Sequence, residues 1–305
     1  MERDGKMTQE ARLGQSPTFL RAIAKRLLPR AALNRLYFRL AAGDEKDFIV
    51  LNTIPKSGTN YFRILVGNYL NVLYENRDTP TGYKEVHTTM FPNERSEYTR
   101  FFAYRRPHPI MTKTPFKDFV YSHGTDFLTL SKGRVVFIYR NPLDYVVSRF
   151  YYNWKYREDR KDVYQHPREI IDYALDPYIE QFTLMSGLAK SRSNILATSY
   201  ESLTSCPIAV FGMIVGWLGL PVHYGAIRKA VEFSSIDQVR KEEEAGGPIH
   251  APETGNFEGF FTRSGKIGQW RDYFTDEDVQ TIADKLGRHG ILLDQFILDP
   301  FQPGE

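Results

Sequence analysis

The sequence predicts an α/β fold in which a P-loop-like parallel β-sheet is flanked by helices on both faces. Strand-length runs rich in apolar residues occur at 48–51, 134–139 and 194–200. Each run is followed by a segment whose apolar residues keep helical spacing. Short buried strands that alternate with helices are typical of a parallel sheet covered on both sides.

Composition favours an ordered protein over a disordered one. Of 305 residues, 42% are hydrophobic and 14% aromatic, which is enough for a substantial core. The net charge of +3 is mild and does not favour nucleic acid as a partner. Cys206 is the single cysteine, so no intrachain disulfide or cysteine-based zinc site is available. With no apolar run of membrane-spanning length and no signal-peptide core, we expect a cytoplasmic protein.

The chain begins with two segments that differ from the rest. Residues 1–17 are polar and irregular, and they predict a disordered tail. Residues 18–46 alternate apolar with basic side chains and predict amphipathic helices broken near Pro29. These helices either dock on the domain or, through 18–42, contact an acidic partner or an anionic membrane surface. Residues 47–305 show no internal repeat or linker and predict one domain.

The first strand of that domain runs into a turn with the residues of an anion site. The turn is Pro-Lys-Ser-Gly-Thr at 55–59, and a helix is predicted directly after it, through 62–70. This order brings free backbone N–H groups and the positive end of a helix to one point, which suits a phosphate or sulfate. The turn differs from the nucleotide-binding G-x-x-x-x-G-K-[ST] loop because Lys56 precedes Gly58.

The later elements follow from periodicity and from turn residues. Residues 72–110 lack regular periodicity and predict a long loop, such as a substrate lid. Residues 245–259 are rich in Gly and Pro and predict a second loop. The remaining patterns predict the end of a short strand at 111–114 and helices at 116–130, 141–151, 167–190, 201–220, 224–232 and 276–290.

Polar residues follow the ends of the predicted strands, where parallel sheets bind ligands. Lys56 follows the first strand, Arg140 the second and Tyr200 the third, with Ser148 two turns into the helix after Arg140. A kinase or GTPase would need a carboxylate at a strand end to hold magnesium. Because Arg140 stands there instead, the sequence predicts direct cationic binding of a phosphate without a metal.

Four motifs in order resemble those of one enzyme family. The loop P-K-S-G-T-N-Y at 55–61 is similar to the 5′-phosphosulfate loop of sulfotransferases, usually P-K-S-G-T-T-W. Residues 135–148 resemble their 3′-phosphate motif, a strand ending in R-N-P-x-D with a serine eight residues after the arginine. Tyr200-Glu201 is similar to their Y-E-D, and 263–274 resembles R-K-G-x-x-G-x-W-x-x-x-F. The chain is identified as a divergent or bacterial-like member of the cytosolic-type sulfotransferases.

The resemblance implies a donor, a product and a reaction. The donor is 3′-phosphoadenosine 5′-phosphosulfate (PAPS) and the product is 3′,5′-bisphosphoadenosine (PAP), with no metal required. A sulfuryl group moves by in-line displacement to a hydroxyl or amine of a small-molecule or carbohydrate acceptor. Lys56 would contact the bridging oxygen and the sulfuryl group. The donor-site residues implied are Lys56, Ser57, Gly58, Thr59, Asn60, Tyr61, Arg140, Ser148, Tyr200, Ser235, Ile236, Arg263, Ser264 and Gly265.

The sequence departs from the family pattern at the catalytic base. Cytosolic members carry K-T-H before the second core strand, and the histidine takes the acceptor proton. This chain has Lys113-Thr114-Pro115 there. We expect Lys113 still to contact the sulfuryl group, but proline accepts no proton. The candidate bases are Glu85 and His87 in the long loop, with His108 and His123 as further alternatives.

Two further departures leave questions open. Ser264 stands where a lysine is common, which predicts weaker 3′-phosphate binding. The family's short C-terminal dimerisation motif has no match, so the oligomeric state stays open.

Two alternative functions are that of a P-loop kinase-like phosphotransferase and, because of Pro115, that of a binding module without activity. The identity of the acceptor stays open.

Overall fold

Four parallel strands form the sheet of this protein. The structure is a computed structural model that describes residues 48–91, 108–116, 118–123, 133–155, 162–246 and 262–297. The strands lie in the order β2-β1-β3-β4 and are β1 (Phe48–Thr53), β2 (Asp118–Ser122), β3 (Arg134–Tyr139) and β4 (Ile195–Ser199). Val50 is paired with both Val120 and Val135. All six residues of β1 are buried, which explains why its sequence is apolar without alternation.

In the described ranges, a helix follows β1, β3 and β4. The α-helices are α3 (Thr59–Glu75), α4 (Tyr83–Glu85), α6 (Pro142–Phe150), α7 (Ile171–Ser191), α8 (Tyr200–Ser205), α9 (Pro207–Leu218), α10 (Tyr224–Phe233), α11 (Ile236–Gly246), α13 (Asp276–Gly287) and α14 (Asp294–Ile297). Shorter 3₁₀ and π turns are η3 (Val86–Met90), η4 (Pro109–Lys113), η5 (Tyr151–Lys155), η6 (Pro167–Ile170) and η7 (Gln269–Asp272).

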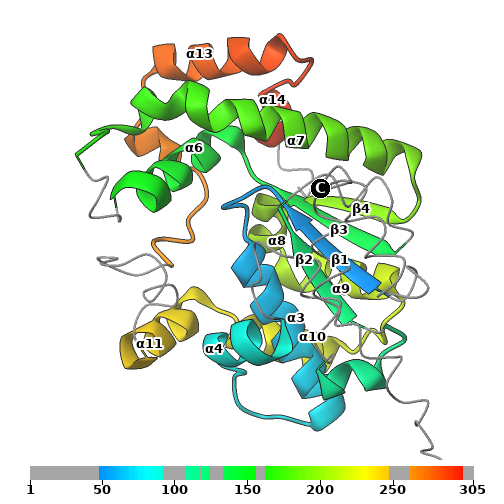
Figure 1. Ribbon diagram of the computed structural model, residues 1–305. Helices are drawn as coiled ribbons and strands as arrows, with labels where there is room; N and C mark the ends of the chain where they lie inside the picture. The colour runs from blue at the N-terminus through cyan, green and yellow to red at the C-terminus, as the bar shows by residue number, and fades with distance from the viewer. Residues whose placement is uncertain are drawn as a thin grey trace, which may run out of the picture. The chain divides into compact units, whose positions relative to one another are not determined.

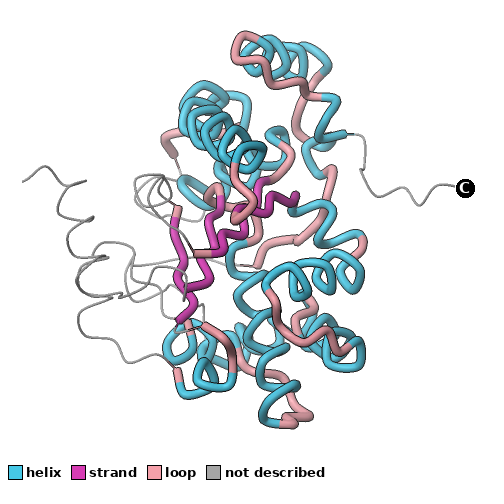
Figure 2. Tube along the Cα trace, turned by 90° about the vertical axis from the view of Figure 1, so that its right-hand side faces the viewer, coloured by secondary structure: helices cyan, strands magenta, loops and turns pink. Residues whose placement is uncertain are grey.

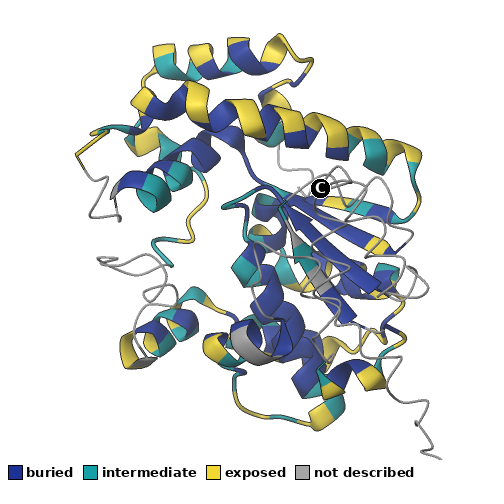
Figure 3. Ribbon diagram, viewed as in Figure 1, coloured by how far each residue is buried: buried dark blue, intermediate teal, exposed yellow. Residues whose placement is uncertain are grey.

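The two faces of the sheet pack against different helices. Helices α3, α9 and α10 lie on one side of the strands, and α6 and α7 lie on the other (Figures 1 and 2). Ile49 and Leu51 of β1 join the core cluster that contains Phe62 of α3 and Phe211 of α9. On the opposite side, the amide of Gln181 on α7 donates a hydrogen bond to Asn52. Figure 3 shows the buried strands between helices whose outer residues are exposed.

Most predicted elements are confirmed by the structure. The strands at 48–51, 134–139 and 194–200 and the helices at 62–70, 141–151, 167–190, 224–232 and 276–290 all form, with small shifts at their ends. Parallel pairing with helices on both faces confirms the predicted fold class. Within the described ranges, no helix combines the length and apolarity needed to cross a membrane.

Several predicted elements were wrong. Residues 111–114 belong to a 3₁₀ turn, and Asp118–Ser122 forms an edge strand where a helix was predicted. Pairing with β1 supplies β2 with the partner that local periodicity does not reveal. Residues 83–90, predicted as loop, are helical, and the helix predicted at 201–220 is divided at Cys206 because Pro207 begins a new helix.

Other predictions lie wholly or largely outside the described residues. These are the tail at 1–17, the basic helices at 18–46, and most of the loop at 245–259, of which residues 245 and 246 belong to α11. The described residues all belong to one compact unit, which is formed by residues 45–95 and 106–305.

Candidate functional site

The turn between β1 and α3 has an unusual backbone. Lys56 has a φ of 69° and Gly58 a φ of 88°, so both occupy the left-handed region. A Cβ on Gly58 would lie 2.5 Å from the ring of Tyr200, so only glycine fits there. The N–H of Ser57 donates to the carbonyl of Ile54 at 3.1 Å, which closes the turn. The sequence therefore forms a tight loop that ends directly on a helix.

The N-terminus of α3 has the features of an anion site. Gly58 is its N-cap and offers no side-chain cap, and the first turn holds no acidic residue. The N–H groups of such a turn have no partner within the helix, and the helix dipole favours negative charge there. The hydroxyls of Thr53 and Thr59 lie 2.7 Å apart and link the end of β1 to the start of α3.

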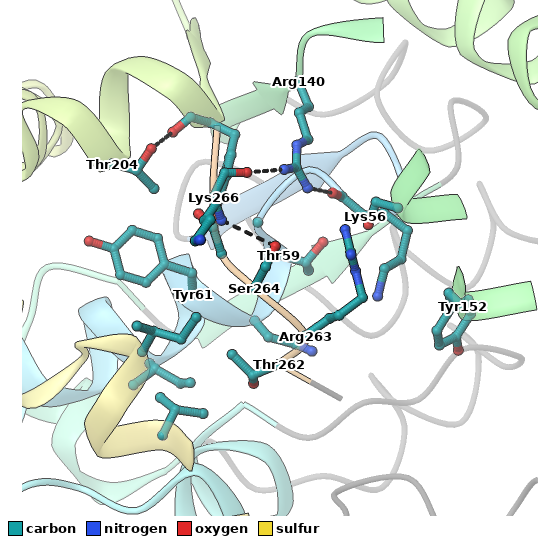
Figure 4. A pocket seen from close by; sticks show the side chains of 18 of the residues that line it. Lys56, Thr59, Tyr61, Arg140, Tyr152, Thr204, Thr262, Arg263, Ser264 and Lys266 are labelled. Atoms are coloured by element: carbon teal, nitrogen blue, oxygen red, sulfur yellow. Dashed lines mark hydrogen bonds between the residues drawn. The ribbon is translucent and has the colours of Figure 1, made fainter. Parts of the chain in front are cut away.

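Arg140 follows β3 and joins the loop to a distant part of the chain. One guanidinium nitrogen donates to the carbonyl of Lys56 at 3.4 Å and another to that of Lys266 at 3.0 Å (Figure 4). The guanidinium also lies 4.6 Å from the ring centroid of Tyr200. The hydroxyl of Tyr200 donates to the carbonyl of Gly265 at 2.9 Å. These contacts bring 55–59 and 263–266 together around one side chain.

Asp144 fixes the C-terminal motif in place. Its carboxylate is fully buried and accepts the N–H groups of Gly268 at 2.7 Å and Trp270 at 3.0 Å. A carboxylate that accepts two backbone N–H groups, one at each oxygen, makes strong hydrogen bonds. The cap of α6 is instead Asn141, whose side chain accepts the N–H of Leu143 at 2.9 Å. Asp144 therefore acts over long range rather than as a local cap.

A cavity of about 820 Å³ opens beside these segments. Its size falls within the range of roughly 300–1,000 Å³ that is typical of ligand sites. Buried guanidinium nitrogens of Arg140 (Nε), Arg149 (Nε) and Arg263 (Nη2) have no hydrogen-bond partner in the described part of the chain. All three arginines line the cavity. Because such nitrogens only donate, they fit an anionic ligand with several phosphate oxygens.

The structure brings nearly all predicted donor-site residues to this cavity. Those that line it are Lys56, Gly58, Thr59, Asn60, Tyr61, Arg140, Ser148, Tyr200, Ser235, Ile236, Arg263, Ser264 and Gly265. Ser57 does not, because its side chain is fully buried beneath the turn. Ser264 donates to the side chain of Gln269 at 3.1 Å, so the serine that replaces a lysine stabilises its own loop.

The position predicted for Lys113 was wrong. Its ammonium donates to the carbonyl of Tyr74 at 3.1 Å and pairs with Glu75 at 2.9 Å. Both partners belong to the C-terminal end of α3, whereas Lys56 lies at the N-terminal end. A helix of 17 residues is about 25 Å long. Lys113 therefore lies too far from the cavity to contact a ligand in it.

The structure also places the two preferred bases outside the cavity lining. Both carboxylate oxygens of Glu85 lie 2.9 Å from Arg77, and this ion pair is partly exposed. His87 is buried, with its ring stacked 3.8 Å from that of Tyr83. His108 caps η4 by accepting the N–H of Ile110. None of these three residues is among those that line the cavity in the described ranges.

His123, at the carboxyl end of β2, does line the cavity. Its Nδ1 lies 2.8 Å from the carbonyl oxygen of Thr53, and its Nε2 lies 2.8 Å from the hydroxyl of Tyr121. Since a carbonyl only accepts, Nδ1 carries the proton and Nε2 accepts from Tyr121. The sequence signal that could have found it is the run Phe119-Val120-Tyr121, because these residues favour a strand and His123 follows its end.

The far part of the cavity is apolar and aromatic. It is lined by Ile64, Tyr83, Tyr121, Tyr152 and Val239. The ammonium of Lys56 lies 4.3 Å from the centroid of the Tyr152 ring. Lys56 therefore stands at the border between the region of phosphate-binding groups and the aromatic region.

Glu201 is a mostly buried acid beside Arg140, with 14% of its side chain exposed. It accepts the N–H of Asn141 at 3.1 Å and lies 3.9 Å from Arg140. Burial raises the pKa of Glu201 to about 7, and the charge of Arg140 opposes the rise only in part. Across the described residues, no group of three or more His, Cys, Asp or Glu side chains is arranged to hold a metal.

Comparisons with known proteins give one consistent match. The family model described as "Sulfotransferase domain" covers residues 46–289. A flavonol 3-sulfotransferase of Flaveria bidentis is 26% identical over 80% of this chain and 83% of its own length. A 3-alpha-hydroxysteroid sulfotransferase of Cavia porcellus is 26% identical over 76% of this chain and 79% of its own. A crystal structure of a mouse sulfotransferase complexed with PAP has a TM-score of 0.57 at 16% identity, covering 82% of this chain and 88% of that one.

Asp144→Asn should weaken binding of PAP while the protein still folds. An amide oxygen can replace one acceptor, but the NH₂ group then faces a backbone N–H, so residues 263–266 lose their anchor. We expect Kd for PAP to rise about tenfold or more by calorimetry, a loss of roughly 1.4 kcal/mol. A far-UV spectrum like that of the wild type controls for folding, and unchanged affinity would contradict the role of Asp144.

Glu201 should make stability depend on pH. Its folded pKa lies above that of the unfolded chain, so its contribution is complete below about pH 4.5 and is lost as pH rises through about 7. From pH 5 to 8, wild type should lose up to about 3 kcal/mol of unfolding free energy relative to Glu201→Gln. Urea denaturation at several pH values measures this, and parallel curves for the two proteins would show that the pKa is not raised.

Proposed function

This chain belongs to the sulfotransferase family, and we propose that it moves a sulfuryl group from PAPS to a hydroxyl of a small, ring-shaped, largely apolar acceptor. Family membership and the arginine at the end of β3 set aside the kinase alternative. One observation carries the proposal. Lys56, which contacts the ring of Tyr152, and His123, which is bonded to Tyr121, line the same cavity as Arg140 and Arg263.

The donor would lie along the N-terminus of α3. The first-turn N–H groups of Thr59, Asn60 and Tyr61 would hold the 5′-phosphate. Arg140, Ser148 and Arg263 would hold the 3′-phosphate, and the unpartnered guanidinium nitrogens support this assignment. The PAP complex of the mouse relative supports the same donor. PAPS supplies the sulfuryl group, and the chain supplies its alignment.

Lys56 would neutralise the charge that develops during transfer. Its ammonium is held at the face of Tyr152, at the border of the two halves of the cavity. From there it would donate to the bridging oxygen and to the sulfuryl oxygens. Transfer of this kind depends mainly on alignment and on charge stabilisation, as phosphoryl transfer does.

His123 would be the catalytic base. The acceptor hydroxyl would replace Tyr121 as the donor to Nε2 and give its proton to that nitrogen. Its oxygen would form the bond to sulfur while the bond from sulfur to the bridging oxygen breaks. The carbonyl of Thr53 holds the proton on Nδ1, so Nε2 keeps the lone pair that accepts from Tyr121 and that would accept from the acceptor hydroxyl in its place. His123 would thus accept the acceptor proton, which Pro115 is unable to do.

The aromatic wall supports a flat or polycyclic acceptor. Three tyrosine rings and two aliphatic side chains enclose this part of the cavity. Such a wall stacks well against rigid ring systems, because aromatic pairs gain energy beyond burial alone. Two relatives are named for a flavonol and a hydroxysteroid, which are ring systems with hydroxyl groups. Small-molecule alcohols of this shape are therefore preferred over carbohydrates.

Lys56→Met and Lys113→Met should behave differently. Loss of the Lys56 charge should lower sulfuryl transfer from labelled PAPS by about 10²-fold or more, since one charge-stabilising group is worth that much. Lys113→Met should keep the wild-type rate because its ammonium pairs with Glu75. Equal losses in the two variants, or full activity in Lys56→Met, would contradict the assignment.

His123→Ala should lower kcat by roughly 10²- to 10⁴-fold, the usual contribution of a general base. Added imidazole should restore part of the rate if the missing group is a proton acceptor. Glu85→Gln, outside the cavity lining, serves as the control and should keep wild-type rates. Affinity for PAP should be unchanged in both variants. A wild-type rate in His123→Ala would assign the base elsewhere.

A further inference from the structure

Tyr83 carries a hydroxyl that the fold does not use. The residue begins α4, is only 2% exposed and lines the cavity. Its hydroxyl oxygen is buried and has no hydrogen-bond partner among the described residues. Buried polar groups are nearly always paired, so an unpaired one costs stability and requires an explanation. A bound molecule in the cavity supplies one.

The position of the Tyr83 ring is fixed from several sides. The ring stacks on His87 with a centroid distance of 3.8 Å and an interplanar angle of 18°. Its backbone N–H donates to the carboxylate of Glu242. Ile64 and Val239 form a small buried cluster with it, and both also line the cavity. The hydroxyl is therefore held in place before any ligand binds.

The surroundings keep this hydroxyl protonated. Burial raises the pKa of Tyr83 well above its ordinary value, the charge of Arg63 opposes the rise, and Glu243 adds to it. A neutral phenol donates one hydrogen bond readily. The positive charge of Arg63 also favours a ligand atom with partial negative charge over an ammonium group. An oxygen atom of the ligand is the partner that fits best.

We propose that the Tyr83 hydroxyl donates a hydrogen bond to a second oxygen of the acceptor, distinct from the hydroxyl that is sulfated. This inference rests on the proposed function. The reacting oxygen must become more nucleophilic, which His123 favours and a donated hydrogen bond would oppose. The two groups therefore suit two different oxygens. The acceptor class is a rigid ring system with a reactive hydroxyl and a further carbonyl, ether or hydroxyl oxygen.

The test compares wild type with Tyr83→Phe on two acceptors. Kaempferol is a flavonol with a ring carbonyl and several hydroxyls, whereas 2-naphthol has one hydroxyl and no other oxygen. We expect kcat/KM for kaempferol to fall roughly three- to tenfold, the value of a neutral hydrogen bond, and that for 2-naphthol to stay unchanged. The melting temperature of the free protein should rise, because an unpaired buried hydroxyl is removed.

Tyr224→Phe is the matched control, and calorimetry is the second measurement of the role of Tyr83. Tyr224→Phe removes an exposed phenol outside the cavity and should change neither value. Equal losses on both acceptors, or a lower melting temperature in Tyr83→Phe, would overturn the inference by indicating a structural role. If wild type sulfates neither compound, the proposed acceptor class fails. Calorimetry then measures the binding of kaempferol to the PAP complex of each protein. If wild type does not bind kaempferol, or if Tyr83→Phe binds it equally well, the role of Tyr83 is overturned.

Discussion

The guanidinium of Arg140 joins the parts of the chain that build the site. It donates to the carbonyls of Lys56 and Lys266, which lie far apart in sequence, and it contacts the ring of Tyr200. Asp144 and Glu201 lie 3.9 Å from it and balance its charge. A buried cation with this many partners is held in one position by several contacts at once. Arg140 therefore fixes the loop at 55–59, the motif at 263–266 and the end of β4 relative to one another.

The arrangement divides the cavity by chemistry. Helix α3 and the arginines offer N–H donors that only an anion satisfies, whereas the tyrosine wall offers stacking surface and few donors. Lys56 and His123 both line the cavity, Lys56 against the ring of Tyr152 and His123 bonded to Thr53 and Tyr121. Because β1 and β2 are adjacent and parallel, their carboxyl ends lie at the same edge of the sheet. The topology of the sheet thus brings the cation and the base that we propose to one cavity.

Sequence reasoning predicted the residues of the loop, Arg140 and the C-terminal motif that line the cavity, and it preferred as bases Glu85 and His87, which are not among the described residues that line it. The loop at 55–61, Arg140 and the motif at 263–265 were found because their spacing is rigid and local. His123 was only an alternative, because β2 was predicted as a helix: its residues Phe119 to Tyr121 favour a strand, but only pairing with β1 fixes where that strand lies. Lys113 was misplaced for the same reason: the strand expected to end there begins only five residues later. Long-range pairing, rather than local propensity, decided these positions.

The left-handed backbone at Lys56 has a consequence for engineering. A side chain other than glycine in this region costs on the order of 1 kcal/mol, so glycine or asparagine would suit the turn better than lysine. Selection for heat resistance alone would therefore tend to replace the residue that we propose to neutralise the developing charge. Libraries for thermostable variants of this enzyme need a selection for turnover at every round, with position 56 held constant.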